Sequence, residues 1–478
     1  MDRRDFLRAA AVAPLLGPAS ALPGSALPGS APDWALLRRQ LSGTLVRPGD
    51  ARYGSARRLF NPAFDTVRPL GVAYCSGAAD VSRCLAFVRA HGLPVTARSG
   101  GHSYAGWSTG TGLVIDVSRM DAIRYADGRA TIGAGAKLID VYAALARHGA
   151  GIPAGTCPTV GVSGLALGGG IGVMSRKYGL TCDTMESVQL VTADGRLLTC
   201  DERRHPDLFW ACRGGGGGNF GVAVSFTFRT HAARDLNVFY LRWPWSAAFA
   251  AVSAWQSWAP AAPDELWSSL TLSRGPGGLE VGVTGVHLGR RAALDRLLAP
   301  LTARAGRPAS RSVTRTSHLE AMKMMGGCSS LSVAQCHPAP HGRLGRAVYV
   351  AKSHVAYRPL PPDGVRALVA GVARPGRHSV MLDALGGAVA RVRPDATAFP
   401  HRAALFSVQY NADGRDRTWL RRVHSAMAPH FGDHAYVNYI DPDLTGWRTA
   451  YYGANAARLS HVKAAYDPTR LFRLPQGI

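Results

Sequence analysis

Two glycine-rich tracts constrain this chain more than any other feature of its sequence. The first, Arg98–Ser103, reads RSGGHS and follows an expected strand at Leu93–Ala97. The second, Gly155–Gly172, reads GTCPTVGVSGLALGGGIG. Because glycine permits conformations and close approaches that a Cβ forbids, both tracts predict turns whose backbone N–H groups face a ligand. Neither tract has the spacing or the later acidic residue of a Rossmann turn, and no Walker lysine is present.

Strand and helix signals alternate along the chain, which predicts an α+β fold. In the first half, the periodicity predicts strands and helices at Gly71–Tyr74, Ala78–His91, Leu113–Val117, Ala130–Gly133, Leu138–Arg147 and Asn219–Thr230, with a hairpin at Ser187–Thr199. In the second half it predicts them at Leu266–Leu272, Leu279–Val286, Ala292–Leu301, Val348–His354, Gly364–Val372 and Ala404–Tyr410. The tail, Tyr436–Ile478, is expected to hold one strand and a helix that ends at Asp467.

Five tryptophans in one stretch after Leu236 mark a change in amino-acid composition, which predicts a second domain. They are Trp243, Trp245, Trp255, Trp258 and Trp267. Such side chains either stack on a sugar or polyketide ring or fill an interface between helix and sheet, and the sequence leaves both interpretations open. The domain boundaries that follow are 33–235, 236–432 and a terminal segment at 433–478.

The first residues have the form of an export signal. The pair Arg3-Arg4 precedes the apolar stretch Ala9–Leu16, and small residues follow at Ala19-Ser20-Ala21. The paired arginines resemble a twin-arginine signal, which predicts transient contact with the twin-arginine translocation machinery and a secreted protein. The next residues read LPGSALPGSAP, so 1–32 is expected to be signal and linker.

The chain is basic, with 55 Lys and Arg against 31 Asp and Glu and a formal net charge of +24. Its arginines are spread over the whole length without a basic block or a known nucleic-acid-binding pattern, which argues against a nucleic-acid partner. No apolar run of membrane-spanning length follows the N-terminal stretch, so no membrane span is expected. The eight cysteines form no CxxC motif and no metal-ligand spacing, so no metal site is expected, and whether Cys328 and Cys336 pair stays open.

Several motifs occur in order along residues 69–478. They are RSGGHSYAG (98–106), GLVIDVSRM (112–120), GTCPTVGVSGLALGGGIG (155–172), RGGGGGNFGV (213–222), YVNYID (436–441) and LFRLPQGI (471–478). Together they resemble the FAD-linked oxidases of the berberine-bridge-enzyme and oligosaccharide-oxidase type, within the vanillyl-alcohol-oxidase (PCMH-type) flavoproteins. The resemblance implies a PCMH-type FAD-binding domain of two subdomains at 33–235, a substrate domain with an antiparallel sheet flanked by helices at 236–432, and a return to the FAD domain at 433–478.

The resemblance also implies how FAD is held. In this family the histidine of the SGGH turn bonds to the benzenoid-ring methyl group of the flavin, and the cysteine of GTCPTVG bonds to the adjacent ring carbon. His102 and Cys157 match these positions, so the resemblance implies FAD attached through two covalent bonds, which would raise its redox potential and favour hydride abstraction. Other residues that the motifs place at FAD are Arg98, Ser99, Gly100, Gly101, Ser103, Val160, Gly161, Gly164, Gly221, Val222 and Asn438.

Hydride transfer from an alcohol carbon needs a base within hydrogen-bond reach of the hydroxyl proton. Berberine-type members use a glutamate on a strand of the substrate domain, but the matching residue here is Gln409, which cannot accept a proton. The resemblance therefore shifts the expected base to Tyr436 of the Y-x-N motif, with Tyr439 in reserve. Because the pKa of a free tyrosine is about 10, a cationic neighbour would have to lower it.

The expected function is that of an exported FAD oxidase. Val160 occupies the position that in the family tends to gate oxygen, and a small side chain there favours an oxidase that releases hydrogen peroxide over a dehydrogenase. The small-molecule substrate would be a saccharide or a (glycosylated) natural product that gives hydride from a hydroxyl-bearing carbon, with O2 as acceptor. Two alternatives stay open. One is a tailoring enzyme of secondary metabolism that oxidatively closes a ring or dehydrogenates its substrate, and the other is a secreted binding protein that keeps the fold without the chemistry.

Overall fold

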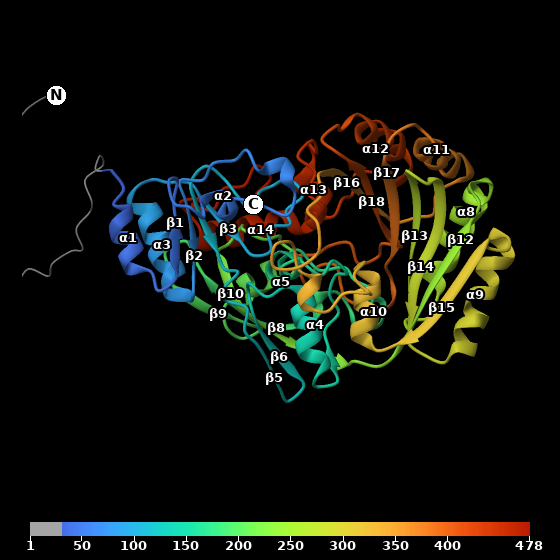
Figure 1. Ribbon diagram of the computed structural model, residues 1–478, viewed down its shortest axis with the longest axis horizontal. Coiled ribbons are helices and arrows are strands. Elements are labelled where there is room, and N and C mark those ends of the chain that lie inside the picture. Colours follow the sequence, from blue (N-terminus) through green and yellow to red (C-terminus); the bar gives the residue numbers. More distant parts are fainter. Residues whose placement is uncertain (1–30) are drawn as a thin grey trace, which may run out of the picture.

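The computed structural model describes residues 31–478 (Figure 1). The expected export signal lies outside the described residues. Within them, eighteen strands form four sheets and fourteen α-helices accompany these sheets, which confirms the α+β prediction.

A four-stranded sheet lies at the N-terminal end of the fold. Its strands, in spatial order, are β1 (Thr44–Val46), β2 (Gly71–Tyr74), β4 (Leu113–Asp116) and β3 (Val95–Arg98), accompanied by α1 (Trp34–Gln40), α2 (Tyr53–Ala56) and α3 (Ala78–Ala90). β2, β4 and β3 are parallel, so their carboxyl ends meet at one edge of the sheet. Arg98 ends β3 opposite Asp116 of β4, and the first glycine turn starts there.

A five-stranded antiparallel sheet follows. Its strands are β5 (Ile123–Ala126), β6 (Arg129–Gly133), β10 (Val222–Arg229), β8 (Met185–Val191) and β9 (Leu197–Cys200), and the expected hairpin is the pair β8–β9. A small ribbon pairs β7 (Ala150–Gly151) with β11 (His231–Ala232). The helices of this part are α4 (Leu138–Ala146), α5 (Val162–Leu167), α6 (Ser175–Tyr178) and α7 (Pro206–Ala211). The second glycine tract therefore spans the passage from β7 to α5 and beyond.

A seven-stranded antiparallel sheet forms the other half of the molecule (Figure 1). Its strands, in spatial order, are β15 (Ser310–Thr316), β12 (Leu236–Trp243), β14 (Gly278–His287), β13 (Leu266–Gly275), β17 (His378–Ala384), β18 (Phe406–Asp413) and β16 (Tyr349–Ala356). Four helices cover its outer face: α8 (Ala248–Ala261), α9 (Arg291–Ala305), α11 (Pro362–Val372) and α12 (Thr418–Phe431).

Side chains alternate between the two faces of this sheet, as they do in any strand. On β18, Phe406, Val408 and Tyr410 join the core under the helices. The residues between them, Ser407 and Gln409, therefore face the other half of the molecule. One face is apolar and covered, and the other carries polar groups toward the FAD-domain side.

The tryptophans belong to the protein interior. Trp243, Trp255, Trp258 and Trp267 are buried, and Trp245 packs against the core under the helices. The indole N–H of Trp255 donates to Ser268 Oγ at 3.0 Å, and that of Trp258 donates to the Leu297 carbonyl at 2.8 Å. Of the two interpretations, the structure supports interface packing.

The expected strand in the tail is wrong. Its residues form a 3-10 turn at Val437–Tyr439, followed by the helices α13 (Trp447–Tyr452) and α14 (Ala456–Tyr466), the last of which ends as predicted. The reason lies in its hydrogen-bond partners. The Tyr436 N–H donates to the side chain of Ser353, at 3.2 Å, and not to the backbone of a neighbouring strand.

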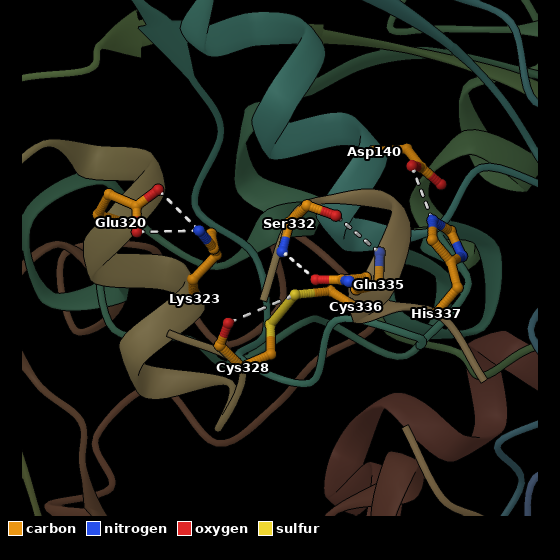
Figure 2. Close-up of a disulfide and its surroundings, with 8 residues drawn as sticks. All are labelled: Asp140, Glu320, Lys323, Cys328, Ser332, Gln335, Cys336 and His337. Carbon is orange, nitrogen blue, oxygen red and sulfur yellow. Dashed lines mark hydrogen bonds and ion pairs between the residues drawn. A yellow bond between two sulfur atoms is a disulfide. The ribbon is translucent and has the colours of Figure 1, made fainter. Parts of the chain in front are cut away.

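The sequence left open whether Cys328 and Cys336 pair, and the structure shows that they do. Cys328 and Cys336 form a disulfide in the segment that follows α10 (His318–Met325) (Figure 2). Both are buried and cluster with Ile139 of α4. Although this segment lies in the second domain of the sequence-based division, it packs on the first, and the boundaries 33–235, 236–432 and 433–478 stay a prediction.

Two further features concern residues 31–478. In that range no helix combines the length and the apolar character needed to cross a bilayer. The same range holds no group of three His, Cys, Asp or Glu side chains arranged to bind a metal ion.

A buried ion pair ties the last helix to the first half of the chain. The Lys463 ammonium lies 2.7 Å from the Asp467 carboxylate and donates to the carbonyls of Asn219 and Phe472 at 2.5 and 2.8 Å. Lys463 is 1% exposed and Asp467 0%. A charge this deeply buried is stable only with its partner.

We expect Lys463→Met to lower the free energy of unfolding by about 3–5 kcal/mol, because the Asp467 carboxylate stays buried without its cation. Urea denaturation followed by tryptophan fluorescence measures the change. Arg393→Met is the matched control, since the pair of Arg393 with Asp395 is exposed and contributes little. Similar shifts of the two variants would contradict the assignment.

Candidate active site

One cavity gathers most of the residues that the sequence places at a cofactor. Among the residues that line it are Arg98, Ser99, Gly100, Gly101, His102, Ser103, Val160, Gly161, Gly164, Gly221, Val222, Asn438 and Tyr439. Cys157, Gln409 and Tyr436 lie outside this lining. The cavity therefore lies where both glycine tracts, β10 and the tail meet.

The two glycine turns are in direct backbone contact. A Cβ on Gly100 would lie 2.2 Å from the Gly161 nitrogen, and a Cβ on Gly161 would lie 2.2 Å from Ser99 Oγ and 2.4 Å from the Gly100 nitrogen. Contacts below 3 Å are not compatible with any side chain, so both positions require glycine. This approach brings His102 and the Cys157 turn to one place.

The side chains of His102 and Cys157 converge on one hydroxyl group. Thr159 Oγ1 lies 2.8 Å from His102 Nε2 and 3.7 Å from Cys157 Sγ. Thr159 is buried, whereas His102 and Cys157 keep partial exposure. The imidazole and the thiol are thus close enough to reach neighbouring atoms of one ligand.

The imidazole of His102 is held on two sides. The Phe60 ring stacks on it, with centroids 4.0 Å apart and planes 20° apart, and Thr159 meets its edge. Burial, together with the nearby Lys137 ammonium, lowers the pKa of His102 to about 3. At neutral pH the ring is therefore uncharged, and one nitrogen carries a lone pair.

The turn after β3 fits a phosphate group. Within the part of the chain that the structure describes, the N–H groups of Gly100, Gly101 and His102 donate no backbone hydrogen bond. Arg98 binds Asp116 through Nε and the Ala56 carbonyl through Nη2 at 2.7 Å, while its buried Nη1 has no partner among the described residues. Free N–H groups and an orphaned guanidinium nitrogen at a cavity wall suit the pyrophosphate of a dinucleotide.

Three tyrosines surround the inner end of this arrangement. Tyr104 stacks on Tyr439, with centroids 5.4 Å apart, and Tyr349 meets Tyr104 edge-on at 5.4 Å. Gln409 Nε2 donates to the Tyr104 hydroxyl at 2.6 Å, so the residue at the expected glutamate position does reach the site through a tyrosine. The ring faces and hydroxyls here offer both stacking and hydrogen bonding to a substrate.

Tyr436 is placed differently from Tyr439. Its hydroxyl accepts hydrogen bonds from the Gly170 N–H at 2.8 Å and from Asn438 Nδ2 at 2.9 Å. Burial raises the pKa of Tyr436 above its ordinary value, and no cation is among the groups that shift it. No cationic neighbour therefore lowers the pKa of Tyr436, although the sequence analysis expected one. Amide groups donate to its hydroxyl oxygen instead.

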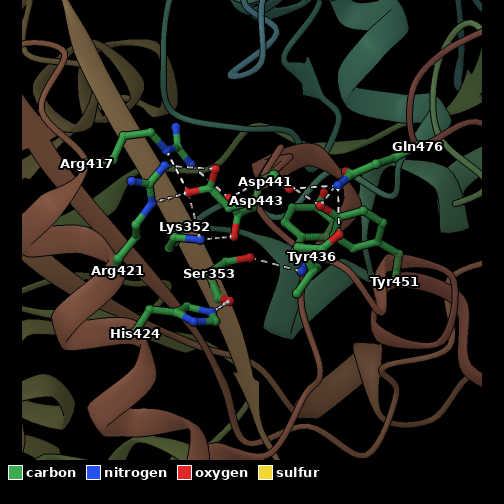
Figure 3. A network of polar contacts seen from close by, with 11 residues as sticks. Lys352, Ser353, Arg417, Arg421, His424, Tyr436, Asp441, Asp443, Tyr451 and Gln476 are labelled. Atoms are coloured by element: carbon green, nitrogen blue, oxygen red, sulfur yellow. Dashed lines mark hydrogen bonds and ion pairs between the residues drawn. The ribbon is translucent and has the colours of Figure 1, made fainter.

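A buried ionic network fixes the tail segment that carries these tyrosines (Figure 3). Lys352 of β16 lies 2.5 Å from Asp441, and Arg417, the residue that precedes α12, lies 2.8 Å from the same carboxylate. Gln476 donates to the Asp441 carbonyl at 2.8 Å. Residues 436–441 are thus anchored to the substrate-domain sheet on one side and to the C-terminus on the other.

Asp383 is a site residue that the sequence analysis missed. It lies on β17, in the row of Ser269 and Ser407, and is 8% exposed. Burial raises the pKa of Asp383 to about 6, against a hydrogen bond from Ser269 that lowers it. Its charge is among the causes that raise the pKa of Tyr439 and of Tyr104, so it lies close to both.

Sequence signals existed for some of the missed residues and not for others. Tyr104 lies inside the motif RSGGHSYAG, and the cavity-lining Phe472 lies inside LFRLPQGI, so these motifs already pointed to the site. Asp383 is a single acid in the otherwise apolar end of HSVMLDA, which is a weak signal. Thr159 becomes noticeable only once the two turns are seen to touch.

The comparisons with known proteins agree with this geometry. The model of the family described as FAD binding domain matches residues 69–201, and the model described as berberine and berberine like matches residues 435–478. Fold and site thus define an FAD-linked oxidoreductase.

Full-length relatives identify the family. FAD-linked oxidoreductase YgaK of Bacillus subtilis is 34% identical over 463 residues, which cover 92% of this chain and 98% of that protein. Chitooligosaccharide oxidase of Gibberella zeae is 32% identical over 446 residues, covering 86% and 87%. The solved structure of Physcomitrella patens BBE-like 1 superposes with a TM-score of 0.86 at 29% identity, covering 93% of this chain and 98% of that one. The chain belongs to the berberine-bridge-enzyme-like family, with its PCMH-type fold.

The contact between the glycine turns makes a sharp prediction. We expect Gly161→Ala to push the turns apart, because the new Cβ would lie 2.2 Å from Ser99 Oγ, and therefore to lower FAD retention at least tenfold. Flavin absorbance per chain after gel filtration measures it. Gly277→Ala, whose Cβ meets only the Glu280 side chain at 3.9 Å, is the control. Normal FAD content in Gly161→Ala would show that the contact is dispensable.

Proposed function

We propose that this chain is an oxidase with bicovalently attached FAD that takes hydride from a hydroxyl-bearing carbon of a saccharide and passes the electrons to O2, which gives hydrogen peroxide. The observation that carries the proposal is the convergence of His102 and Cys157 on the Thr159 hydroxyl. A neutral imidazole and a thiol that both contact one hydroxyl group suit two bonds to one benzenoid ring. Bound FAD would supply the hydride acceptor, its N5.

The protein's part is to accept the hydroxyl proton, and the geometry favours Tyr439 over Tyr436 for this task. Tyr439 lines the cavity, whereas the Tyr436 hydroxyl is held by Gly170 and Asn438 behind it. With a pKa of about 6, the Asp383 carboxyl is ionised at neutral pH. We infer that Tyr439 takes the substrate proton while the Asp383 carboxylate takes the phenol proton of Tyr439, because a neutral tyrosine can accept a proton only as it releases its own.

The sheet face behind the tyrosines supports a saccharide as substrate. Polar side chains of Thr284, Ser269, Ser407 and Gln409 share the face toward the FAD domain, by their alternation with core residues. Sugars present many hydroxyls to such groups and flat ring faces to tyrosines. A relative of this chain is named for oxidation of chitooligosaccharides.

Two finer parts of the proposal rest on the sequence. Val160 lines the cavity, and its small side chain supports reoxidation by O2. The pair Arg3-Arg4 supports export by the twin-arginine route and secretion, although residues 1–30 lie outside the described range.

Covalent attachment is tested by single variants. We expect His102→Ala and Cys157→Ala each to leave the flavin attached through one bond, so that each denatured variant still carries flavin, while the double variant releases it in acid. Flavin fluorescence in denaturing gels and peptide mass measure this. If one single variant keeps both attachments, its residue is not a link. A wild-type chain that loses all flavin in acid contradicts the bicovalent proposal.

The proton acceptor is tested by rates of flavin reduction in anaerobic stopped-flow experiments with oligosaccharides. We expect Asp383→Asn and Tyr439→Phe to slow reduction by about 100-fold or more. Tyr436→Phe, with flavin retained, should slow it less. Because a protonated Asp383 cannot assist, the wild-type rate should fall as the pH drops through about 6, and Asp383→Asn should lose this dependence. An unchanged pH profile in Asp383→Asn would exclude that residue.

A further inference from the structure

Thr159 is neither a cofactor ligand by sequence nor a catalytic base, yet its hydroxyl joins the two residues proposed to bond FAD. Its Oγ1 lies 2.8 Å from His102 Nε2 and 3.7 Å from Cys157 Sγ. The side chain is 1% exposed, so neither contact competes with bulk water. The Thr159 hydroxyl therefore contacts both side chains, His102 and Cys157, that are proposed to bond FAD.

The backbone holds Thr159 in this position. The turn 157–160 is closed by a hydrogen bond from the Val160 N–H to the Cys157 carbonyl at 3.3 Å. The first residues of α4 bind on either side of Thr159, since the Ile139 N–H donates to the Pro158 carbonyl at 3.1 Å and the Leu138 N–H donates to the Val160 carbonyl at 3.0 Å. These backbone hydrogen bonds therefore fix the position of the Thr159 hydroxyl.

The end of the segment around Gly326 packs against the same turn. A Cβ on Gly326 would lie 2.8 Å from the Thr156 carbonyl oxygen and 3.1 Å from Pro158, so Gly326, two residues before the disulfide-bonded Cys328, packs closely against the turn. On the inner side, Phe60 stacks on the His102 ring. This stacking restricts rotation of the imidazole, so that Nε2 keeps its contact with Thr159 Oγ1.

The single hydroxyl proton limits the states that this group allows. If Oγ1–H donates to Nε2, the imidazole proton lies on Nδ1, which then has no lone pair for a bond. If instead Nε2–H donates to Oγ1, the lone pair lies on Nδ1 and the hydroxyl proton is free to point to the sulfur of Cys157. Of the two tautomers, only the second leaves both side chains ready to react.

We propose that Thr159 is a positioning residue for FAD attachment: it fixes His102 in the Nε2–H tautomer, so that Nδ1 forms the bond, and its hydroxyl donates a hydrogen bond to the sulfur of Cys157 as the thiol loses its proton. This proposal rests on the bicovalent attachment proposed above. It makes the two bonds depend on one hydroxyl group.

The attachment balances as two oxidations. At the methyl carbon, the new N–C bond replaces one C–H bond, and the methyl hydrogen and the imidazole hydrogen leave as two protons and two electrons. At the ring carbon, the new S–C bond replaces one C–H bond, with loss of the thiol hydrogen and the same yield of electrons. In each case O2 takes two electrons and two protons and becomes hydrogen peroxide.

The test compares full-length chains prepared under flavin limitation and then supplied with FAD in air. Thr159→Val keeps the shape and removes the hydroxyl, and Thr159→Ser keeps the hydroxyl. We expect Thr159→Ser to attach FAD like the wild type. In Thr159→Val both bonds should form at least about tenfold more slowly, as loss of a hydrogen bond of ordinary strength implies. Flavin fluorescence in denaturing gels gives the rate.

A second readout reports on the tautomer and not on stability. Flavin-bearing histidine released by hydrolysis should be the Nδ1 isomer alone in the wild type and in Thr159→Ser, and a mixture of Nδ1 and Nε2 isomers in Thr159→Val. Attachment by Thr159→Val at the wild-type rate and with one isomer overturns the inference. If Thr159→Val and the smaller Thr159→Ala both fail to retain FAD, the hydroxyl serves binding, and the inference is also overturned. A wild-type chain without covalent flavin instead removes the proposed function.

Discussion

The contact between the backbones of Gly100 and Gly161 is the constraint on which the rest of the site depends. No side chain fits at either position, because a Cβ would approach the opposite turn to about 2.2 Å. The contact joins the end of a parallel sheet to the turn that precedes α5. Through it His102 and Cys157 meet at Thr159. The first turn, whose N–H groups donate no backbone hydrogen bond among the described residues, lines the cavity. The proposed cofactor attachment and phosphate binding would thus share one structural cause.

The second half of the molecule closes the site from the opposite side. The seven-stranded sheet buries its apolar face under helices and turns its polar face, with Asp383 and Gln409, toward the tyrosines. The tail is anchored between the two halves by Lys352, Asp441 and Lys463, so that Asn438 and Tyr439 reach the cavity. Buried ion pairs are costly to leave unpaired, and their loss would disturb the position of this segment.

Much of the architecture could be predicted from the sequence because local patterns determined it. The alternating strands, the hairpin and the helix Ala78–Ala90 follow from periodicity and turn residues, and the two glycine turns follow from their unusual composition. The tail strand was wrong because the Tyr436 N–H finds its partner in the side chain of Ser353, which is distant in sequence. No local pattern contains such a partner.

The same reason explains the errors in the site. The environment of Tyr436 was expected to contain a cation, but the amides of Gly170 and Asn438 surround its hydroxyl. Asp383 gains its raised pKa from burial between two halves that are far apart in the sequence. Thr159 was part of a quoted motif, yet its significance depends on a contact across two turns. Charge environments and shared partners arise from tertiary structure and need coordinates.

Peptide mapping of the native, flavin-loaded chain tests whether one flavin joins the two turns. After complete tryptic digestion, residues 99–119 carry His102 and residues 148–176 carry Cys157, with no cleavage site inside either peptide. We expect one species whose mass is the sum of both peptides and one flavin, with loss of four hydrogens. Two separate peptides, with flavin on neither or on only one of them, would contradict it.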